Sequence, residues 1–344
     1  MSARASTVAP VPVFSHLLRM TDRVGLFEHA LFVEPRREHG YCADDVSRAL
    51  VVVLREPART RALDLAAETY LSYLEAAVEA DGSVRNRRSA AGNWEPDAST
   101  GDCWGRTINA LGFAARSGTT RSIRLRATRA FLRAARARSD DVRAAAFAVL
   151  GAAEFLRGRP DLPGPAELLL RDCLAQIPRG AHSGWQWPEP RLRYANAALC
   201  DALVFGGAVL RRRDDVREGL RMLEALLEIE TGGRGHLSVT GTDGRGPDDP
   251  GPLWDQQPIE PAVIADACVH AAQVTRDPLW HRGVDLACAW FLGANDADVM
   301  VYDTTTGAGH DGLEPHGRNQ NCGAESTIAA LSTIQHARAM AVPR

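Results

Sequence analysis

The sequence contains no lysine, although it has 40 basic residues, all of them arginine. This absence excludes mechanisms that need a lysine amine, such as a Schiff base, a Ser–Lys dyad or the phosphate-binding lysine of a Walker A loop. Long apolar runs are missing as well, since no stretch approaches the roughly 18 residues typical of a membrane-spanning helix. A net charge of −3 gives no reason to expect a nucleic-acid or membrane partner.

Common cofactor and metal motifs are also missing. No GxGxxG follows a strand, and the chain has no GxSxG, HExxH, CxxC or aspartate-rich DDxxD motif. His310, His316 and Cys322 do not have a recognised ligand spacing. We therefore expect neither a bound metal nor a cofactor.

The seven cysteines are odd in number, and most lie within apolar helical patterns. They are expected to be buried free thiols in a reducing cytoplasm rather than a disulfide framework. The first ten residues lack the basic start and apolar core of a signal peptide. We therefore expect a flexible leader over 1–10 and a cytoplasmic protein.

Apolar residues recur at spacings of three and four along most of the chain, which indicates an all-α protein. Strand signals are weak and confined to 237–240 and 299–302. The spacing predicts twelve helices, near 11–20, 42–55, 61–80, 103–116, 121–138, 141–158, 164–176, 194–211, 214–230, 257–275, 278–293 and 324–340.

The connections between these helices alternate between short and long. If successive helices are antiparallel, the long connections all fall on one face of the molecule. Twelve helices in six pairs match an (α/α)6 toroid, and no linker divides the chain, so we expect one domain over 11–344. Loops of this length inside a compact domain are usually functional. The long loops cover 20–41, 81–102, 177–193, 231–256 and 294–323.

These long loops combine aromatic rings with carboxylate, amide and guanidinium groups, whereas a solubilising loop needs only small polar residues. A ligand with many hydroxyls and apolar ring faces, such as a saccharide or glycoside, matches this mixture. The residues expected to bind it are His39, Tyr41, Trp104, Arg106, Trp185, Trp187, Glu189, Tyr194, Asn196, Gln256, Gln257, Asp311, Asn319 and Asn321.

Four carboxylates at or near predicted helix starts, Asp45, Asp102, Glu260 and Glu325, are the catalytic candidates. Each also has a structural explanation, because acidic residues there cap a helix or favour its dipole. Glycosidic cleavage needs a proton donor and a second carboxylate. We expect Asp102, beside an aromatic wall, to be the acid and Glu260 or Glu325 to be the base. Inversion is favoured because a broad toroid cavity leaves room for a water.

Four ordered motifs resemble those of a family of bacterial (α/α)6-toroid proteins described as glycosyltransferase-associated or glycosidase-like. The resemblance spans about 14–340 and implies a toroid with a sugar-related role, in some cases beside a glycosyltransferase. The chain departs from the family pattern at Val46, Gly101 and Ala195, where the family usually has Asn, Glu and Asp. The motifs are Gly40-Tyr41-Cys42-x-Asp44-Asp45-x-x-Arg48-Ala49-Leu50, Trp187-Pro188-Glu189-Pro190-x-Leu192-x-Tyr194-x-Asn196-Ala197, Asp255-Gln256-Gln257-Pro258-Ile259-Glu260 and Asn319-x-Asn321-x-Gly323-Ala324-Glu325-Ser326.

Two alternatives to a glycosidase remain open. The three departures remove polar groups around the expected cavity, which favours a non-catalytic glycan-binding protein that assists a glycosyltransferase. A sugar epimerase or isomerase on the same toroid would need a histidine acid/base pair, which His39 with His310 or His316 could supply.

Overall fold

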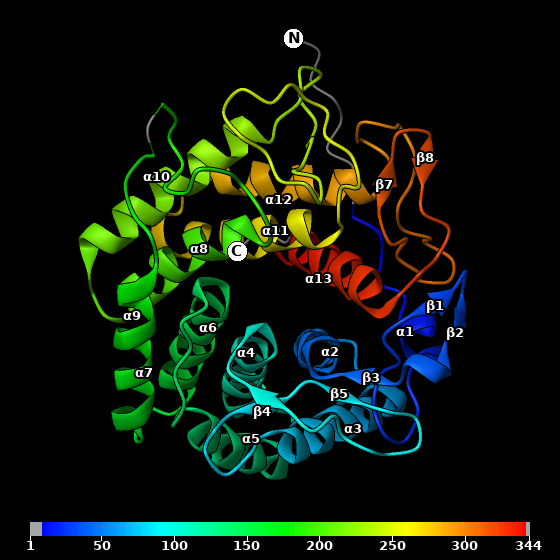
Figure 1. Cartoon of the computed structure of the whole chain (residues 1–344), viewed down its shortest axis with the longest axis vertical. Helices are drawn as coiled ribbons and strands as arrows, with labels where there is room; N and C mark the ends of the chain where they lie inside the picture. The colour runs from blue at the N-terminus through cyan, green and yellow to red at the C-terminus, as the bar shows by residue number, and fades with distance from the viewer. Residues whose placement is uncertain (1–8, 183, 342–344) are drawn as a thin grey trace.

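The computed structural model describes residues 9–182 and 184–341, so most of the expected leader over 1–10 lies outside the described residues. Helices form two concentric rings (Figure 1). The inner ring contains α2 (Ala43–Arg55), α4 (Asp102–Ser117), α6 (Val142–Gly158), the continuous run α8 (Asn196–Asp201), η2 (Ala202–Gly206) and α9 (Gly207–Val209), α11 (Ile259–Thr275) and α13 (Ala324–Ala341). The outer ring contains α1 (Ser15–Arg19), α3 (Arg61–Ala77), α5 (Arg121–Ala134), α7 (Pro163–Gln176), α10 (Arg213–Ile229) and α12 (Pro278–Phe291).

The inner ring is closed on itself. Each inner helix packs against the next along the chain, and α13 packs against α2. The outer helix α1 packs against both α13 and α3, so it covers the junction between the last and first hairpins. Arg338 of α13 donates a hydrogen bond to the carbonyl of Ala9 (3.3 Å) at this junction.

Local sequence signals explain where several helices begin. Thr60, Thr120, Asp141 and Asp277 each accept a backbone N–H of the following helix through their side chains. Proline stands in the first turn of α7 and α12, where its missing N–H costs nothing. The helix boundaries therefore agree with the sequence prediction to within a few residues.

Small residues allow the inner helices to approach closely. A Cβ atom placed on Gly112 of α4 would lie 1.9 Å from the carbonyl oxygen of Gly151 in α6. Side chains at these crossing points would therefore force the two helices apart. The neighbouring surface of α6 is alanine-rich and buried nearly all round, as expected for a helix enclosed within a protein.

The long loops share the face at which every inner helix begins, as the alternating connections predict. In the part of the chain that the structure describes, short strands occur only in these loops: β1 (Ala30–Leu31), β2 (Glu34–Pro35), β3 (Tyr41–Cys42), β4 (Val84–Arg85), β5 (Arg87–Arg88), β6 (Ala98–Ser99), β7 (Leu313–Glu314) and β8 (Gly317–Arg318), with a 3-10 turn, η1 (Arg37–His39). Backbone pairings join the loops to one another: Tyr41 with Arg88, Leu192 with Arg245, Gln256 with Leu313, and Cys322 with Phe32.

The expected strand pieces over 237–240 and 299–302 do not form strands. Leu237 and Tyr302 make only isolated bridges, to Thr231 and Gly309. Their apolar residues instead pack under the loops, so burial rather than strand pairing explains the pattern. All seven cysteines are free and buried, as expected.

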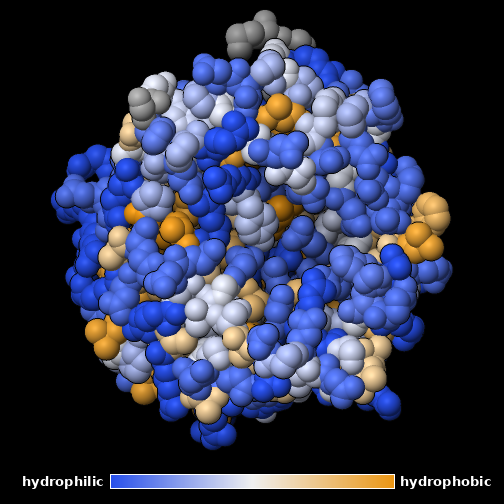
Figure 2. All heavy atoms as spheres, in the orientation of Figure 1, coloured by the Kyte–Doolittle hydropathy of each residue, from blue (hydrophilic) through white to orange (hydrophobic). Residues whose placement is uncertain are grey.

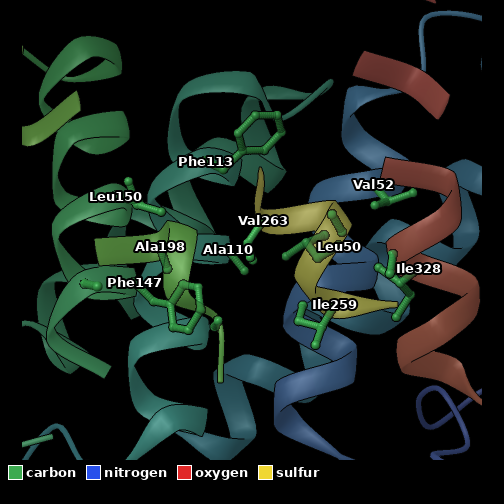
Figure 3. Packing of buried hydrophobic residues seen from close by; sticks show 14 of the residues in the cluster. Leu50, Val52, Ala110, Phe113, Phe147, Leu150, Ala198, Ile259, Val263 and Ile328 are labelled. Carbon is green, nitrogen blue, oxygen red and sulfur yellow. The ribbon is translucent and has the colours of Figure 1, made fainter. Parts of the chain in front are cut away.

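A cavity of about 410 Å³ extends along the axis inside the inner ring. Its middle is apolar: Figure 3 shows Val52, Phe113, Leu150, Val263 and Ile328 projecting from five different inner helices toward a shared space. Figure 2 shows the loop face, which is mostly hydrophilic, with hydrophobic side chains visible in the hollow near its centre. Among the described residues, no helix has the length and apolarity needed to cross a membrane.

Candidate functional site

Arg48 forms ion pairs with three carboxylates at the end of the ring where the inner helices begin. It lies one turn into α2, and its Nε atom is 3.0 Å from Asp44 Oδ1. Its Nη2 atom is 2.7 Å from Asp45 Oδ1, and its Nη1 atom is 2.8 Å from Glu325 Oε2 on α13. One guanidinium group therefore links the first and last inner helices.

Arg106 of α4 likewise forms ion pairs with carboxylates on two inner helices, α2 and its own. Its Nε atom lies 3.2 Å from Asp44 Oδ1 and 3.3 Å from Asp102 Oδ2. It also donates to the hydroxyl of Tyr194, which in turn donates to Asp102 Oδ2 at 3.2 Å. We call the result the ion-pair chain; its members in spatial order are Glu325, Arg48, Asp44, Arg106 and Asp102, with Asp45 and Tyr194 attached to it.

The ends of the ion-pair chain face solvent and its middle does not. The side chains of Asp102 and Glu325 are 30% and 34% exposed, whereas that of Arg106 is only 5% exposed. Burial raises the pKa of Asp102, and this outweighs the opposing effect of Arg106. Burial also acts to raise the pKa of Asp44, but Arg48 and Arg106 outweigh it, so that this pKa is lowered. The pKa values of Asp102 and Asp44 are therefore shifted in opposite directions within one ion-pair chain.

A second pocket, of about 380 Å³, adjoins Tyr194 on the loop face and is lined in part by Gln257 and Glu260. Glu260 is buried, and its Oε1 atom accepts the backbone N–H of Ala195 at 2.6 Å. Its Oε2 atom lies 3.4 Å from the amide nitrogen of Asn196. Burial and the neighbouring Glu230 raise the pKa of Glu260 to about 8. Glu260 therefore anchors the start of α8, although it borders the pocket.

Several aromatic and amide candidates are fully enclosed. Trp104 and Trp187 are 0% exposed, and Tyr41 is 1% exposed. Their polar atoms bond within the protein, for example Tyr41 to Asp22 (2.8 Å) and Trp104 to the carbonyl of Ala134 (3.1 Å). Tyr41 and Trp187 pack within the loops, and Trp104 packs between α4 and the end of α5, so these rings do not line the cavity.

The remaining candidates hold loops in place. Glu189 pairs with Arg143 and accepts from the indole of Trp187, and the half-buried Trp185 donates to the Glu189 carbonyl. Gln256 is buried between Asp296 and Trp290. Asp311 accepts the backbone N–H of Gly323 (2.6 Å), Asn319 accepts that of Asn321 (2.9 Å), and Asn321 accepts that of Phe32 (2.9 Å).

The histidines named for the epimerase alternative are not brought together as a pair. His39 is exposed beside Glu38. His310 is held by the carbonyl of Asn319 (2.9 Å), and His316 is exposed in the turn between β7 and β8. No acid/base pair is formed by these three residues.

Two members of the ion-pair chain, Asp44 and Arg48, belong to the first sequence motif but were not among the predicted binding or catalytic residues. Their spacing contained the signal, because residues four apart on a helix face one another and form ion pairs. One trio of potential metal ligands, Glu28, Cys42 and Asp45, has ligand atoms within 4.8 Å of one another. Arg87 already forms an ion pair with Glu28, and Arg48 forms one with Asp45. Two of the three possible ligands are therefore already neutralised by arginine.

Comparisons with known proteins identify the fold. No family model matches the chain, and no curated protein matches it in sequence. A sugar epimerase from a ruminal bacterium superposes with a TM-score of 0.71 at 12% identity, covering 96% of each chain. Cellobiose 2-epimerase from Bacillus thermoamylovorans gives 0.68 at 8% identity, covering 94% of this chain and 96% of that one.

A third similar structure is an inactive variant of an α-1,6-mannanase from Salegentibacter, in complex with α-1,6-mannotetrose. It gives a TM-score of 0.65 at 8% identity and covers 95% of this chain and 96% of that one. The chain thus has the (α/α)6-toroid fold. Its structural neighbours are carbohydrate-active enzymes, among them epimerases, an isomerase and glycoside hydrolases.

Proposed function

We propose that the protein is a carbohydrate-active enzyme that cleaves a glycosidic bond at the loop face. The observation that carries this proposal is the ion-pair chain, whose two solvent-facing ends are the carboxylates Asp102 and Glu325. Glycosidic cleavage uses two carboxyl groups in unlike environments, one to protonate the leaving oxygen and one to activate water.

Asp102 takes the role of acid in this proposal. Its pKa is raised by burial, and Tyr194 and Arg106 fix the position of its Oδ2 atom. A carboxyl group that keeps its proton toward neutral pH is suited to protonating a departing sugar oxygen.

Glu325 takes the role of base. It projects from the first turn of α13, and Arg48 holds only one of its oxygens in the described structure. Glu260 is less suited to this role, because backbone and side-chain N–H groups occupy its oxygens. The reaction is proposed to invert, with a water placed between Glu325 and the sugar.

The consecutive aspartates Asp44 and Asp45 are proposed to support this site by fixing Arg48 and Arg106. The mannanase among the similar structures is inactive when two consecutive aspartates are replaced by alanine. A pair of adjacent acids is therefore compatible with sugar chemistry on this fold.

The test compares Asp102→Asn and Glu325→Gln with the parent protein on a panel of aryl glycosides and oligosaccharides. Each amide keeps the shape of its carboxyl group but cannot transfer a proton, so turnover should fall by roughly 10²–10⁴-fold while sugar binding persists. Asp97→Asn is the matched control, because Asp97 is exposed in the loop before α4. Proton NMR of the first product should show the inverted anomer.

Three outcomes would overturn the proposal. Parent-like turnover in both amide variants would remove the assigned residues from the chemistry. Binding of a glycan without cleavage would favour the glycan-binding alternative. Interconversion of free sugars without cleavage would favour an epimerase or isomerase.

A further inference from the structure

The axial cavity becomes polar again at its far end, where the inner helices finish. Two histidines line it there, each paired with an aspartate from another inner helix. His270 Nδ1 on α11 lies 2.7 Å from Asp201 Oδ1 on α8, and His336 Nε2 on α13 lies 2.5 Å from Asp266 Oδ1 on α11. The ring of Phe205 stacks on His270 with a centroid distance of 4.0 Å.

Two arginines complete this polar end. Arg116 at the end of α4 pairs with Glu154 of α6. Arg55 at the end of α2 donates to the hydroxyl of Ser332 (2.7 Å) and lies 3.7 Å from Asp266 Oδ1. We call this set the far cluster; its members are Arg55, Arg116, Glu154, Asp201, Asp266, His270, Ser332 and His336.

The far cluster is balanced in charge. Arg116 offsets Glu154, Arg55 offsets Asp266, and the Asp201–His270 pair is neutral when it holds one proton, on either residue. A charged ligand would therefore find no uncompensated partner there. A neutral ligand with several hydroxyls would find both donors and acceptors, beside the apolar walls that the cavity supplies.

The second nitrogen of each imidazole remains available to such a ligand. Neither His270 Nε2 nor His336 Nδ1 has a hydrogen-bond partner among residues 9–182 and 184–341. Burial lowers the pKa of His336 to about 4, so its ring is neutral near pH 7. Burial also acts to lower the pKa of His270, but Asp201 outweighs it and raises this pKa.

The cavity has its own mouth at this end. Gln273 and Ala339, which line it, are exposed in the last turns of α11 and α13. At the opposite end the cavity is bounded by Arg48 and Arg106 of the ion-pair chain. These two buried guanidinium groups therefore stand between the far cluster and the loop-face carboxylates.

We propose that the far cluster is a second ligand site, entered from the helix C-terminal face, that binds a neutral polyhydroxylated molecule of about monosaccharide size. The whole axial cavity, of which the far cluster lines one end, has a volume of about 410 Å³, within the range of small-molecule sites. Glu154, Asp201 and His336 are buried, and burying ionisable groups in pairs is often no better for stability than apolar packing. Ligand recognition gives these groups a role that folding does not require.

The test is titration of the full chain with D-glucose and with myo-inositol, followed through the imidazole resonances of its ten histidines. Each probe is taken to about 10 mM, a concentration that would nearly saturate a site with a dissociation constant of about 1 mM. The resonances of His270 and His336, assigned with His270→Gln and His336→Gln, should shift together and saturate. D-glucuronate, which carries a charge, should bind at least tenfold more weakly. No shift with either neutral probe, or equal binding of glucuronate, would overturn the proposal.

Two exposed substitutions locate the entrance. Ala339→Trp places an indole at the mouth and should weaken binding at least tenfold, whereas Val274→Trp, exposed nearby but outside the cavity lining, should leave it unchanged. Asp102→Asn alters the loop-face site and should not affect the histidine shifts. Loss of the shifts in Asp102→Asn would assign the ligand to the loop face and refute a second site, independently of whether the protein cleaves glycosides.

Discussion

The two ends of the inner ring carry opposite charges in their helix termini. Where the inner helices begin, the first turns hold Asp44, Asp45, Asp102, Glu260 and Glu325. Where they finish, the last turns hold Arg55, Arg116, Arg157 and Arg338. Parallel helix dipoles favour acids at the first end and cations at the second, so the barrel itself stabilises this polarity.

The two ends differ in how their charges are shared. At the loop face, two arginines serve four carboxylates, and each arginine contacts acids on more than one element. At the far end, each carboxylate has its own principal partner. Removing one arginine from the loop face should therefore leave several carboxylates without a partner. Removing one from the far end should affect a single carboxylate.

The largest expected effect is that of Arg48→Ala. This change leaves Asp44, Asp45 and Glu325 without a shared cation, and breaking a buried ion pair costs about 3–5 kcal/mol in the free energy of unfolding. Arg116→Ala is the matched change at the far end, where one carboxylate, Glu154, loses its partner and the arginine is 32% exposed. Urea unfolding should show a loss for Arg48→Ala at least twice that for Arg116→Ala. Equal losses would refute the contrast between shared and separate pairs.

The next effect is the change in the free energy of unfolding with pH. It has opposite signs for His336 at the far end and for Glu260 at the loop face. The pKa of His336 is lowered to about 4 from 6.5, so the unfolded chain binds this proton first as pH falls. Stability should therefore be lost between about pH 6.5 and 4, by about 3 kcal/mol in total. The pKa of Glu260 is raised to about 8, so its contribution is lost as pH rises from about 4.5 to 8.

Unfolding in urea at stepped pH, with His336→Gln and Glu260→Gln, separates these contributions. His336→Gln should flatten the decline below pH 6.5, and Glu260→Gln should flatten the decline toward pH 8. The pKa of Asp266 is lowered to about 2, below the pH ranges in which His336 and Glu260 act, so its titration does not overlap with theirs. A parent-like pH profile in His336→Gln would contradict the assignment.

The smallest effect compares two left-handed residues, one at each end. Ala195 precedes α8 at the loop face with φ of 49°, and Arg276 ends α11 at the far face with φ of 61°. Glycine removes the cost of this conformation but adds unfolded-state entropy, so each substitution should stabilise by about 0.5–1 kcal/mol. Thermal unfolding of Ala195→Gly and Arg276→Gly measures both. A loss of stability in Ala195→Gly would indicate that the hydrogen bond from the backbone N–H of Ala195 to Glu260 depends on packing of the alanine side chain.

The helical frame was predictable because it depends on local signals. Apolar spacing marked the long helices, and capping residues such as Thr60 and Asp277 marked their starts. The shared face of the loops followed from the alternation of connection lengths. The short strands were not predictable, since pairs such as Tyr41 with Arg88 join loops that are distant in sequence.

The candidate site was predictable only in part. Asp45, Asp102, Arg106, Tyr194 and Glu325 come together as neighbours. Loop aromatics such as Trp187 were expected at a ligand, but loops this long bury their own small cores, which takes these rings out of reach.

His270 and His336 had no local motif at all. Their partners Asp201 and Asp266 lie 69 and 70 residues away on other helices. The signal that was present, a charged residue on an otherwise apolar helix face, does not by itself name a partner.

The hydrogen bond from Arg338 to the carbonyl of Ala9, with α1 packed against α13 and α13 packed against α2, closes the ring across this junction. At this junction α13 and α2 contact each other, as neighbouring inner helices do elsewhere in the ring. A circularly permuted chain, joined across this junction and opened instead at the short link 118–120, should therefore form the same ring. Which hairpin comes first is a property of the polypeptide and not of the folded architecture.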